Sequence, residues 1–471
     1  MATSGNDNCN ANDSVWQFRG NGAMSDAAAV TLRKLVFGMF KNCNFNNGKT
    51  ILPSTTHSFK TCPEAEEAVA AAVRSGMANS YAPSPGIFNA RRAVADYLNC
   101  ELPTKLRPED VYITGGCNQA IEIVIDSLAG NPAGNILLPN PGYPHYDARA
   151  IHSGVEVRKY DLLPERDFEI DLDGLEAAAD KNTVALVLIN PNNPCGNVYT
   201  YDHLKKVAEM AKKLGIVVIS DEVYDKVVYG ERPFVPMGTF ASIAPVITFG
   251  SISKGWVVPG WRIGWMAMND PNRILKNAGV VESIEDCLDL TPQPSFLLQE
   301  ALPEILEKTP KEYFAKKNKA MKRNVELSFE RLRDIPCLFC HKKPESCSYL
   351  WLRLDTSVLD YIENDLDFCT KLVSEESLIL VPGVALGAKN WVRISIGTEE
   401  SELAETFDRL KSFYSRHAIS KENIKSHVSR NREPADAEQD PNRPCPLGHV
   451  DEPDRVFDRT CTARKILARA R

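Results

Sequence analysis

The sequence lacks an apolar run long enough to cross a membrane, and it carries no excess of positive charge. It has 55 lysines and arginines against 62 aspartates and glutamates, and the net charge of -7 gives no support to nucleic acid as a partner. The segment Met1–Ser14 contains neither the apolar stretch of a secretory signal nor the arginines of a transit peptide. We therefore expect a globular, cytoplasmic protein without membrane-spanning helices.

Closely spaced cysteine pairs are also scarce in the sequence. The 13 cysteines are an odd number and are scattered through apolar and mixed contexts, which favours free thiols over a disulfide framework. Cys337-Leu-Phe-Cys340-His341 matches the C-x-x-C-H pattern of haem attachment. Neither an export signal nor the second cysteine pair of a structural zinc site accompanies it. We interpret this stretch as a strand and turn and predict no metal or haem.

The sequence has no internal repeats, and its length predicts two domains. Apolar runs alternate with amphipathic helices, which predicts an α/β fold with a mostly parallel sheet covered by helices. The expected strands are 111–114, 135–138, 184–189, 216–220 and 246–249; the expected helices are 27–40, 61–75, 89–99, 119–128, a helix from about 146, and 201–214. Thr61 is the expected N-cap of its helix.

The pattern changes near residue 304. A long charged helix (310–333), strands at 348–354 and 391–397, and helices at 365–374 and 401–417 predict a smaller α+β domain. The polar, Arg- and Pro-rich end is expected to be disordered. We therefore divide the chain into an N-terminal arm and lid segment (1–60), a large domain (61–305), a small domain (306–418) and a tail (419–471).

Unusual residues follow the ends of the predicted strands. Gly116, Tyr143, Asn193, Asp221 and Lys254 all lie at or just beyond a carboxyl end. Open α/β sheets bind their ligands at this edge. The five positions therefore predict one shared site.

Lys254 follows a run of small residues, with Ser251 before it and Arg262 after it. A lysine whose pKa shifts readily suits Schiff-base chemistry, and a serine and an arginine suit a phosphate. The alternative is a loop lysine beside an aromatic cluster. This stretch alone leaves both interpretations open.

Asp221 follows an apolar strand, so its carboxylate is expected to be nearly buried and to require a cationic partner. A protonated pyridine nitrogen is such a partner, as in pyridoxal phosphate enzymes. Tyr224, three residues on, lies on the same side of the predicted turn. The alternative for Asp221 is a helix cap.

Three further segments fit the same ligand. Gly116 and Cys117 join a strand to a helix, where free backbone N–H groups bind phosphate, although the motif is not that of a dinucleotide site. Tyr143 lies between prolines and can stack on a planar ring, and Asn193 can donate to a phenolate oxygen. Packed turn residues are the alternative. Together these residues fit a phosphorylated, hydroxylated pyridine aldehyde.

Four motifs resemble one family. They are Asn190-Pro-Asn-Asn-Pro-Cys-Gly196, Ser220-Asp-Glu-Val-Tyr224, Ser251-Ile-Ser-Lys-Gly-Trp256 and Pro259-Gly-Trp-Arg-Ile-Gly-Trp265. The chain resembles the fold-type I, class I aminotransferases from about Val15 to His417. More closely, it is similar to the plant tyrosine aminotransferase subfamily, which includes nicotianamine aminotransferase and the S-alkyl-thiohydroximate lyase.

The resemblance implies a role for each residue around pyridoxal 5′-phosphate. Lys254 would be the Schiff-base lysine and proton shuttle, and Asp221 would hold the pyridine nitrogen protonated. Tyr224 and Asn193 would bond the ring oxygen, and Tyr143 would stack on the ring. The phosphate would be held by Ser251, Arg262 and the backbone of Gly116 and Cys117.

The resemblance also implies substrate and subunit contacts. Arg393 would form a fork with the substrate α-carboxylate, with Asn193 as a second substrate-binding residue. Tyr81 would reach the phosphate of a neighbouring subunit, which implies a homodimer. The stretch Leu52–Phe59 departs from the family, which has a Gly-Asp-Pro segment there that closes over the substrate.

The implied reaction exchanges an amino group between an aromatic, tyrosine-like amino acid and a 2-oxo acid such as 2-oxoglutarate. One alternative is a C–S lyase that acts on S-alkyl-thiohydroximate or cysteine conjugates with the same lysine. A second is a weakly active protein of the same fold, suggested by the altered Leu52–Phe59 segment.

Overall fold

The computed structural model describes residues 38, 51–52, 59–129 and 134–419, all within one compact unit, Met1–Ile419. The helix predicted at 27–40 and nearly all of the predicted tail lie outside the described residues, apart from Gly38. The domain boundaries proposed after residues 60 and 305 stay predictions.

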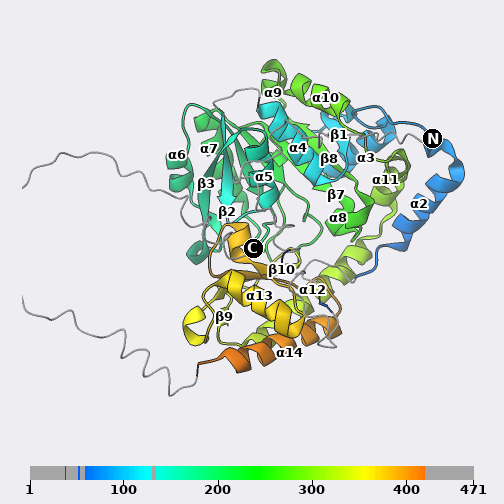
Figure 1. The fold of residues 1–471 in the computed structure, drawn as a ribbon. Helices are drawn as coiled ribbons and strands as arrows, with labels where there is room; N and C mark the ends of the chain where they lie inside the picture. Colours follow the sequence, from blue (N-terminus) through cyan, green and yellow to red (C-terminus); the bar gives the residue numbers. More distant parts are fainter. Residues whose placement is uncertain (1–37, 39–50, 53–58, 130–133, 420–471) are drawn as a thin grey trace, which may run out of the picture. The chain divides into compact units, whose positions relative to one another are not determined.

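An eight-stranded sheet forms the larger part of the described chain (Figure 1). In spatial order its strands are β1 (Val111–Thr114), β8 (Gly264–Asn269), β7 (Val246–Ser251), β6 (Val217–Asp221), β5 (Thr183–Ile189), β2 (Asn135–Asn140), β3 (Glu156–Leu163) and β4 (Glu169–Ile170). The pairs from β7 to β3 are parallel, whereas β8 runs antiparallel to both β1 and β7, and β4 runs antiparallel to β3. The predicted α/β class is confirmed.

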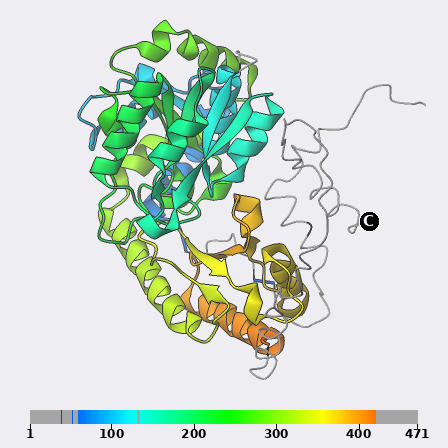
Figure 2. The same cartoon turned by 90° about the vertical axis from the view of Figure 1, so that its left-hand side faces the viewer.

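Helices cover both faces of this sheet, which explains why its central strands β5, β6 and β7 are almost fully buried (Figure 2). Ala185 and Val187 of β5 pack in one cluster with residues of α4 (Cys117–Leu128), α5 (Pro144–His152) and α10 (Val280–Leu290). Leu186 and Leu188 point the other way, toward α6 (Leu172–Ala178) and α7 (Tyr201–Leu214). The packing on both faces of the sheet therefore fixes the positions of its strand ends.

A third cluster packs around β1 and β8. Its helices are α2 (Pro63–Ser75), α3 (Phe88–Asn99), α8 (Ile252–Gly255) and α11 (Phe296–Lys308). The predicted N-cap of α2 is wrong by one residue. Cys62 precedes the helix, with Pro63 as its first residue, where a missing N–H costs no hydrogen bond. The short α9 (Ile274–Asn277) lies before α10.

A second sheet of four antiparallel strands has the order β11 (Val381–Pro382), β12 (Trp391–Ser395), β10 (Tyr349–Leu354) and β9 (Leu338–Phe339). It packs with α12 (Lys311–Leu332), α13 (Asp365–Glu376) and α14 (Glu400–His417), as Figure 2 shows. The predicted helices and strands of this region agree with these bounds within a few residues.

Short 3-10 helices occupy Met77–Asn79, Pro108–Asp110, Pro164–Arg166, Met237–Phe240, Pro259–Trp261, Thr356–Val358 and Gly383–Leu386. Leu52 pairs with Leu378 beside the four-stranded sheet, while 53–58 of the altered segment lie outside the described residues.

The nine cysteines of the described chain are free, and Cys337 and Cys340 lie just before and just after β9. Within residues 59–129 and 134–419, no group of three His, Cys, Asp or Glu side chains is arranged to hold a metal ion. None of the helices in the described part of the chain is long and apolar enough to span a membrane.

Candidate active site

One pocket of about 260 Å³ lies at the carboxyl ends of β5, β6 and β7. Nine of the eleven residues singled out in the sequence line it: Cys117, Tyr143, Asn193, Asp221, Tyr224, Ser251, Lys254, Arg262 and Arg393. Six other residues share the lining: Asn118, Ile189, Val223, Ser253, Pro259 and Tyr349. The structure thus brings together residues from both sheets and from the segments that follow the strand ends of the large sheet.

Gly116 lies directly against this pocket without lining it. Its φ is +86°, and a Cβ there would lie 2.7 Å from Nη2 of Arg262. That guanidinium nitrogen donates to the carbonyl of Gly115 over 2.7 Å. Only glycine therefore allows the α4 N-terminus and Arg262 to come this close.

Tyr81 does not belong to the pocket of its own chain. Its side chain is 95% exposed, and it lies between α2 and α3. Its predicted contact with a neighbouring subunit stays a prediction.

Lys254 lies on the four-residue helix α8, at the end of β7. Ser251 caps this helix, because its Oγ accepts from the backbone N–H of Ser253 (3.0 Å). The Ser251 hydroxyl also reaches the carbonyl of Ile263 at 2.7 Å. Lys254 Nζ is 5.8 Å from the ring centroid of Tyr224.

Asp221 is only 5% exposed at the end of β6. Its carboxylate accepts from the hydroxyl of Tyr146 (3.1 Å) and from the backbone N–H of Val223 (3.3 Å). Burial raises the pKa of this carboxyl to about 6, against the lowering effects of both hydrogen bonds and of the Lys254 charge. Asp221 forms no ion pair with the described residues, so the site has a buried acceptor for a cationic ligand group.

Arg393 is 3% exposed on β12 and faces the pocket. Its Nη1 donates to Oδ1 of Asn193 over 2.9 Å, and its Cζ lies 4.0 Å from the ring centroid of Tyr349. The buried Nε has no hydrogen-bond partner within the described chain. An unpartnered guanidinium N–H in a pocket is suited to an incoming carboxylate.

The aromatic residues of the pocket contact one another. The Tyr224 hydroxyl donates to that of Tyr349 at 3.2 Å. Tyr143 packs edge-on against Tyr146, and its hydroxyl donates to Asn118 (3.3 Å). Sequence reasoning missed Tyr349 and Tyr146. The spacing from Tyr143, the N-cap of α5, to Tyr146 was a usable signal for the second, because residues three apart lie on the same side of a helix start.

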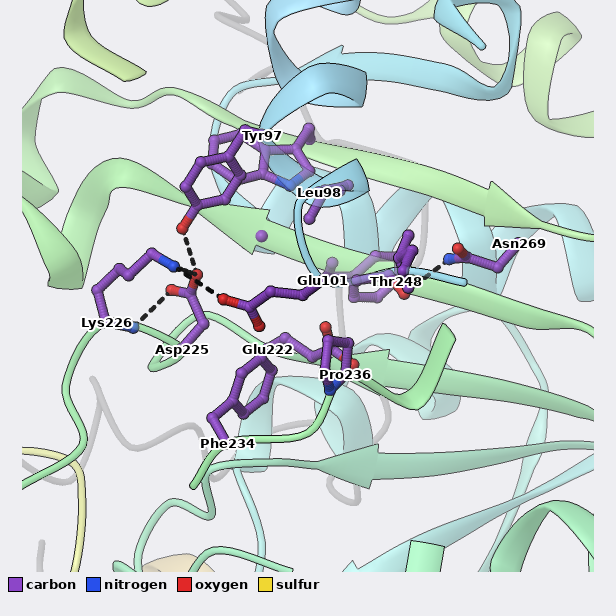
Figure 3. A pocket seen from close by; sticks show the side chains of 14 residues that line it. Tyr97, Leu98, Glu101, Glu222, Asp225, Lys226, Phe234, Pro236, Thr248 and Asn269 are labelled. Atoms are coloured by element: carbon purple, nitrogen blue, oxygen red, sulfur yellow. Dashed lines mark hydrogen bonds and ion pairs between the residues drawn. The ribbon is translucent and has the colours of Figure 1, made fainter. Parts of the chain in front are cut away.

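Glu222, the residue that follows β6, lines a different pocket, which Figure 3 shows. Its Oε1 accepts from the Ser220 hydroxyl and from the backbone N–H of Met237, both at 2.8 Å. Tyr97, Asp225 and Lys226 are joined nearby by hydrogen bonds and ion pairs (Figure 3). The end of β6 thus presents one buried carboxyl group to each of two pockets.

Comparison with known proteins accounts for this arrangement. The family model described as "Aminotransferase class I and II" matches residues 45–410. The chain belongs to the class I and II aminotransferases. The family predicted from the four motifs is confirmed, and the chain is an enzyme of the aminotransferase type.

Two plant relatives place this aminotransferase more narrowly. It is 79% identical to "Probable aminotransferase TAT3" of Arabidopsis thaliana over 431 residues, covering 90% of this chain and 97% of the relative. It is 59% identical to "S-alkyl-thiohydroximate lyase SUR1" of the same plant, covering 87% and 90%. The resemblance to this plant subfamily is confirmed.

A solved structure shares the fold. The crystal structure of tyrosine aminotransferase from Leishmania infantum has a TM-score of 0.78 and 29% sequence identity. The similarity covers 86% of this chain and all of the other. Together with the eight-stranded sheet, this likeness confirms the predicted fold-type I architecture.

Proposed function

We propose that this aminotransferase uses pyridoxal 5′-phosphate to exchange an amino group between an aromatic, tyrosine-like amino acid and a 2-oxo acid such as 2-oxoglutarate. The observation that carries the proposal is the common lining of one pocket by Lys254, Asp221 and Arg393. The likeness to a probable aminotransferase and to a tyrosine aminotransferase supports the amino donor.

The residues of the pocket fit the cofactor group by group. Buried Asp221, which has no ion pair in the described chain, suits a protonated pyridine nitrogen. The close approach of Gly116 to Arg262 forms a cradle at the N-terminus of α4 that suits a phosphate. We assign Cys117 and Ser251 to the same phosphate, Tyr143 to the face of the ring, and Tyr224 and Asn193 to its oxygen.

When bound, the cofactor supplies an electron sink for the electrons of the substrate α-carbon. Lys254 Nζ would hold its aldehyde carbon, and the same amine would take up and return the α-carbon proton. Asn193 orients the Arg393 guanidinium, whose free Nε would receive the substrate carboxylate. Substrate orientation and proton transfer thus involve separate residues of one pocket.

Purified, cofactor-loaded protein tests the proposal with tyrosine and 2-oxoglutarate as substrates. We expect glutamate and the tyrosine-derived oxo acid in equal amounts. Lys254→Ala is expected to abolish both this exchange and the pH-dependent visible absorbance of the bound cofactor. Lys213→Ala, at an exposed lysine of α7, is the matched control and should leave both unchanged. A Lys254→Ala variant that retains both would contradict the assignment.

The likeness to the thiohydroximate lyase favours a second candidate function, C–S elimination from a cysteine or thiohydroximate conjugate. The same Lys254 amine would remove the α-proton, and the products would differ because the β-thiolate leaves. Thiol release from an S-conjugate, measured beside oxo-acid release from tyrosine at equal enzyme concentration, separates the two. Thiol release that is faster by a factor of ten or more would favour the lyase, at roughly 1.4 kcal/mol per tenfold.

We also propose that the enzyme is a homodimer in which Tyr81 contacts the phosphate of the neighbouring subunit. The support is its 95% exposure between α2 and α3, together with the family resemblance. Tyr81→Phe should weaken cofactor retention. Mixed dimers of Tyr81→Phe and Lys254→Ala should regain sites in which neither change is present.

A further inference from the structure

Tyr349 links the two sheets of the enzyme at the candidate active site. It lies on β10 of the four-stranded sheet, is 5% exposed, and lines the same pocket as Lys254. The roles proposed above leave its hydroxyl unused. Two contacts define its position, one through its ring and one through its oxygen.

The ring of Tyr349 lies under the Arg393 guanidinium, with 4.0 Å between Cζ and the ring centroid. Attraction between a cation and an aromatic face is strong where both groups are desolvated, as they are here. The ring therefore fixes the group that would receive the substrate carboxylate.

The oxygen of Tyr349 contacts a different part of the site. It accepts a hydrogen bond of 3.2 Å from Tyr224, whose ring centroid is 5.8 Å from Lys254 Nζ. One side chain thus contacts both the carboxylate-binding arginine and the tyrosine beside the catalytic lysine.

We propose that Tyr349 is a positioning residue that couples carboxylate binding at Arg393 to the hydrogen bonding of the Tyr224 hydroxyl. The proposal rests on the function proposed above. A carboxylate on Arg393 neutralises one of the positive charges next to the phenol and makes its oxygen a poorer acceptor. Tyr224 then donates more readily to another oxygen in the pocket, the one assigned to the cofactor ring.

The electrostatics of Tyr349 agree with this coupling. Burial by itself would raise the pKa of its phenol, but the charges of Lys254 and Arg393 and the hydrogen bond from Tyr224 bring it below its ordinary value. Neutralising Arg393 would therefore raise the pKa of the Tyr349 phenol.

Two variants separate the ring from the hydroxyl. Tyr349→Phe keeps the ring under Arg393 and removes the bond to Tyr224, whereas Tyr349→Leu removes both. The probe is 3-phenylpropanoate, a carboxylate that has no amino group to exchange. We expect its affinity to change less than about 2-fold in Tyr349→Phe and to fall about 2- to 30-fold in Tyr349→Leu.

The second readout is the pH midpoint of the visible absorbance of the bound cofactor, with and without the probe. In the wild type the probe should shift this midpoint, and Tyr349→Phe and Tyr224→Phe should each reduce the shift. The double variant should reduce it no further than either single change, because both changes break the same bond.

Equal loss of probe affinity in Tyr349→Phe and Tyr349→Leu would overturn the role of the ring, and additive effects of the two Phe changes would overturn the coupling.

Tyr160→Phe is the matched control. Its buried hydroxyl donates to the carbonyl of Val187 at 2.6 Å, and Tyr160 does not line the pocket, so the loss of this hydroxyl should change neither readout. If Tyr349→Leu does not bind the cofactor, the comparison of Tyr349→Phe, Tyr224→Phe and the double variant tests the coupling without it. Absence of amino exchange in the wild type would contradict the proposed function itself.

Discussion

Asp221 is the last residue of β6 and Glu222 follows it directly, yet their carboxyl groups line different pockets. Successive side chains of a strand point to opposite sides, so one apolar strand delivers two buried acids. Burial raises the pKa of Asp221 to about 6 and that of Glu222 to about 8. The two groups therefore make different contributions to the pH dependence of stability.

For Asp221 we predict a cofactor-induced stabilisation that grows with pH. The unloaded fold binds a proton more tightly than the unfolded chain, so its stability falls as pH rises from 3.8 to about 6. A protonated pyridine nitrogen removes this effect. The rise in Tm on loading with pyridoxal phosphate should therefore be larger at about pH 7.5 than at about pH 5, as thermal unfolding will measure. The same pH dependence in Asp221→Asn would contradict the prediction.

For Glu222 we predict that Glu222→Gln gains stability relative to the wild type as pH rises from 4.5 to about 8. Over this range the unfolded chain releases the proton that the folded chain retains, which disfavours the wild-type fold by at most about 1.4 kcal/mol per pH unit. Glutamine keeps an acceptor for Ser220 and Met237. Glu222→Ala leaves both donors without that acceptor and should lose about 1–3 kcal/mol. Denaturant unfolding at about pH 5 and 7.5 measures each difference.

Gly116→Ala tests the phosphate cradle. We expect cofactor affinity to fall about 10- to 100-fold, because the new methyl displaces the Arg262 guanidinium, whose Nη2 is 2.7 Å away. Gly215→Ala is the control, since its φ is also positive (+71°) but nothing lies within 4 Å of the added Cβ. Both variants should lose about 1 kcal/mol of stability through the backbone, and only Gly116→Ala should lose cofactor, as equilibrium dialysis will show.

Lys317 on α12 gives a prediction about the helix that carries Lys254. Its buried amine donates to the backbone carbonyls of Gly255 and Lys254, the latter at 3.5 Å. Burial lowers its pKa to about 7, so between pH 7 and 10.5 the unfolded chain binds a proton that the folded chain does not. Wild-type stability should rise by about 2–3 kcal/mol from pH 7 to 9 relative to Lys317→Met. Lys319→Met, at an exposed lysine of the same helix, is the control in denaturant titrations; no difference between Lys317→Met and the wild type would contradict the prediction.

The sequence predicted most strands of the large sheet because each is a short apolar run that ends at a glycine, an asparagine or a charged residue. It also predicted the pocket, since parallel strands place their carboxyl ends at one edge. It did not reveal β8, whose antiparallel course between β1 and β7 depends on pairing between distant segments. The residue pattern within one strand does not specify its pairing with strands that are distant in sequence.

Tyr349 and Lys317 were not predicted from the sequence, for the same reason that β8 was not. Tyr349 meets Tyr224 across 125 positions, and Lys317 meets Gly255 across 62. Neither has a local motif, because a buried tyrosine in a strand and a lysine in a charged helix are ordinary in sequence. Their importance comes from long-range packing that only the folded chain displays.

The pairing of Leu52 with Leu378 determines which fragments of the chain can fold on their own. Leu52 N–H donates to the carbonyl of Ser377 and its carbonyl accepts from Ile379 N–H, both over 3.0 Å, and Ile51 and Phe59 pack on the same core. The core beside the four-stranded sheet therefore includes chain from before the large sheet. A fragment starting at α12 should be poorly soluble, whereas joining residues 51–59 to its start by a flexible linker should restore a cooperative unfolding transition.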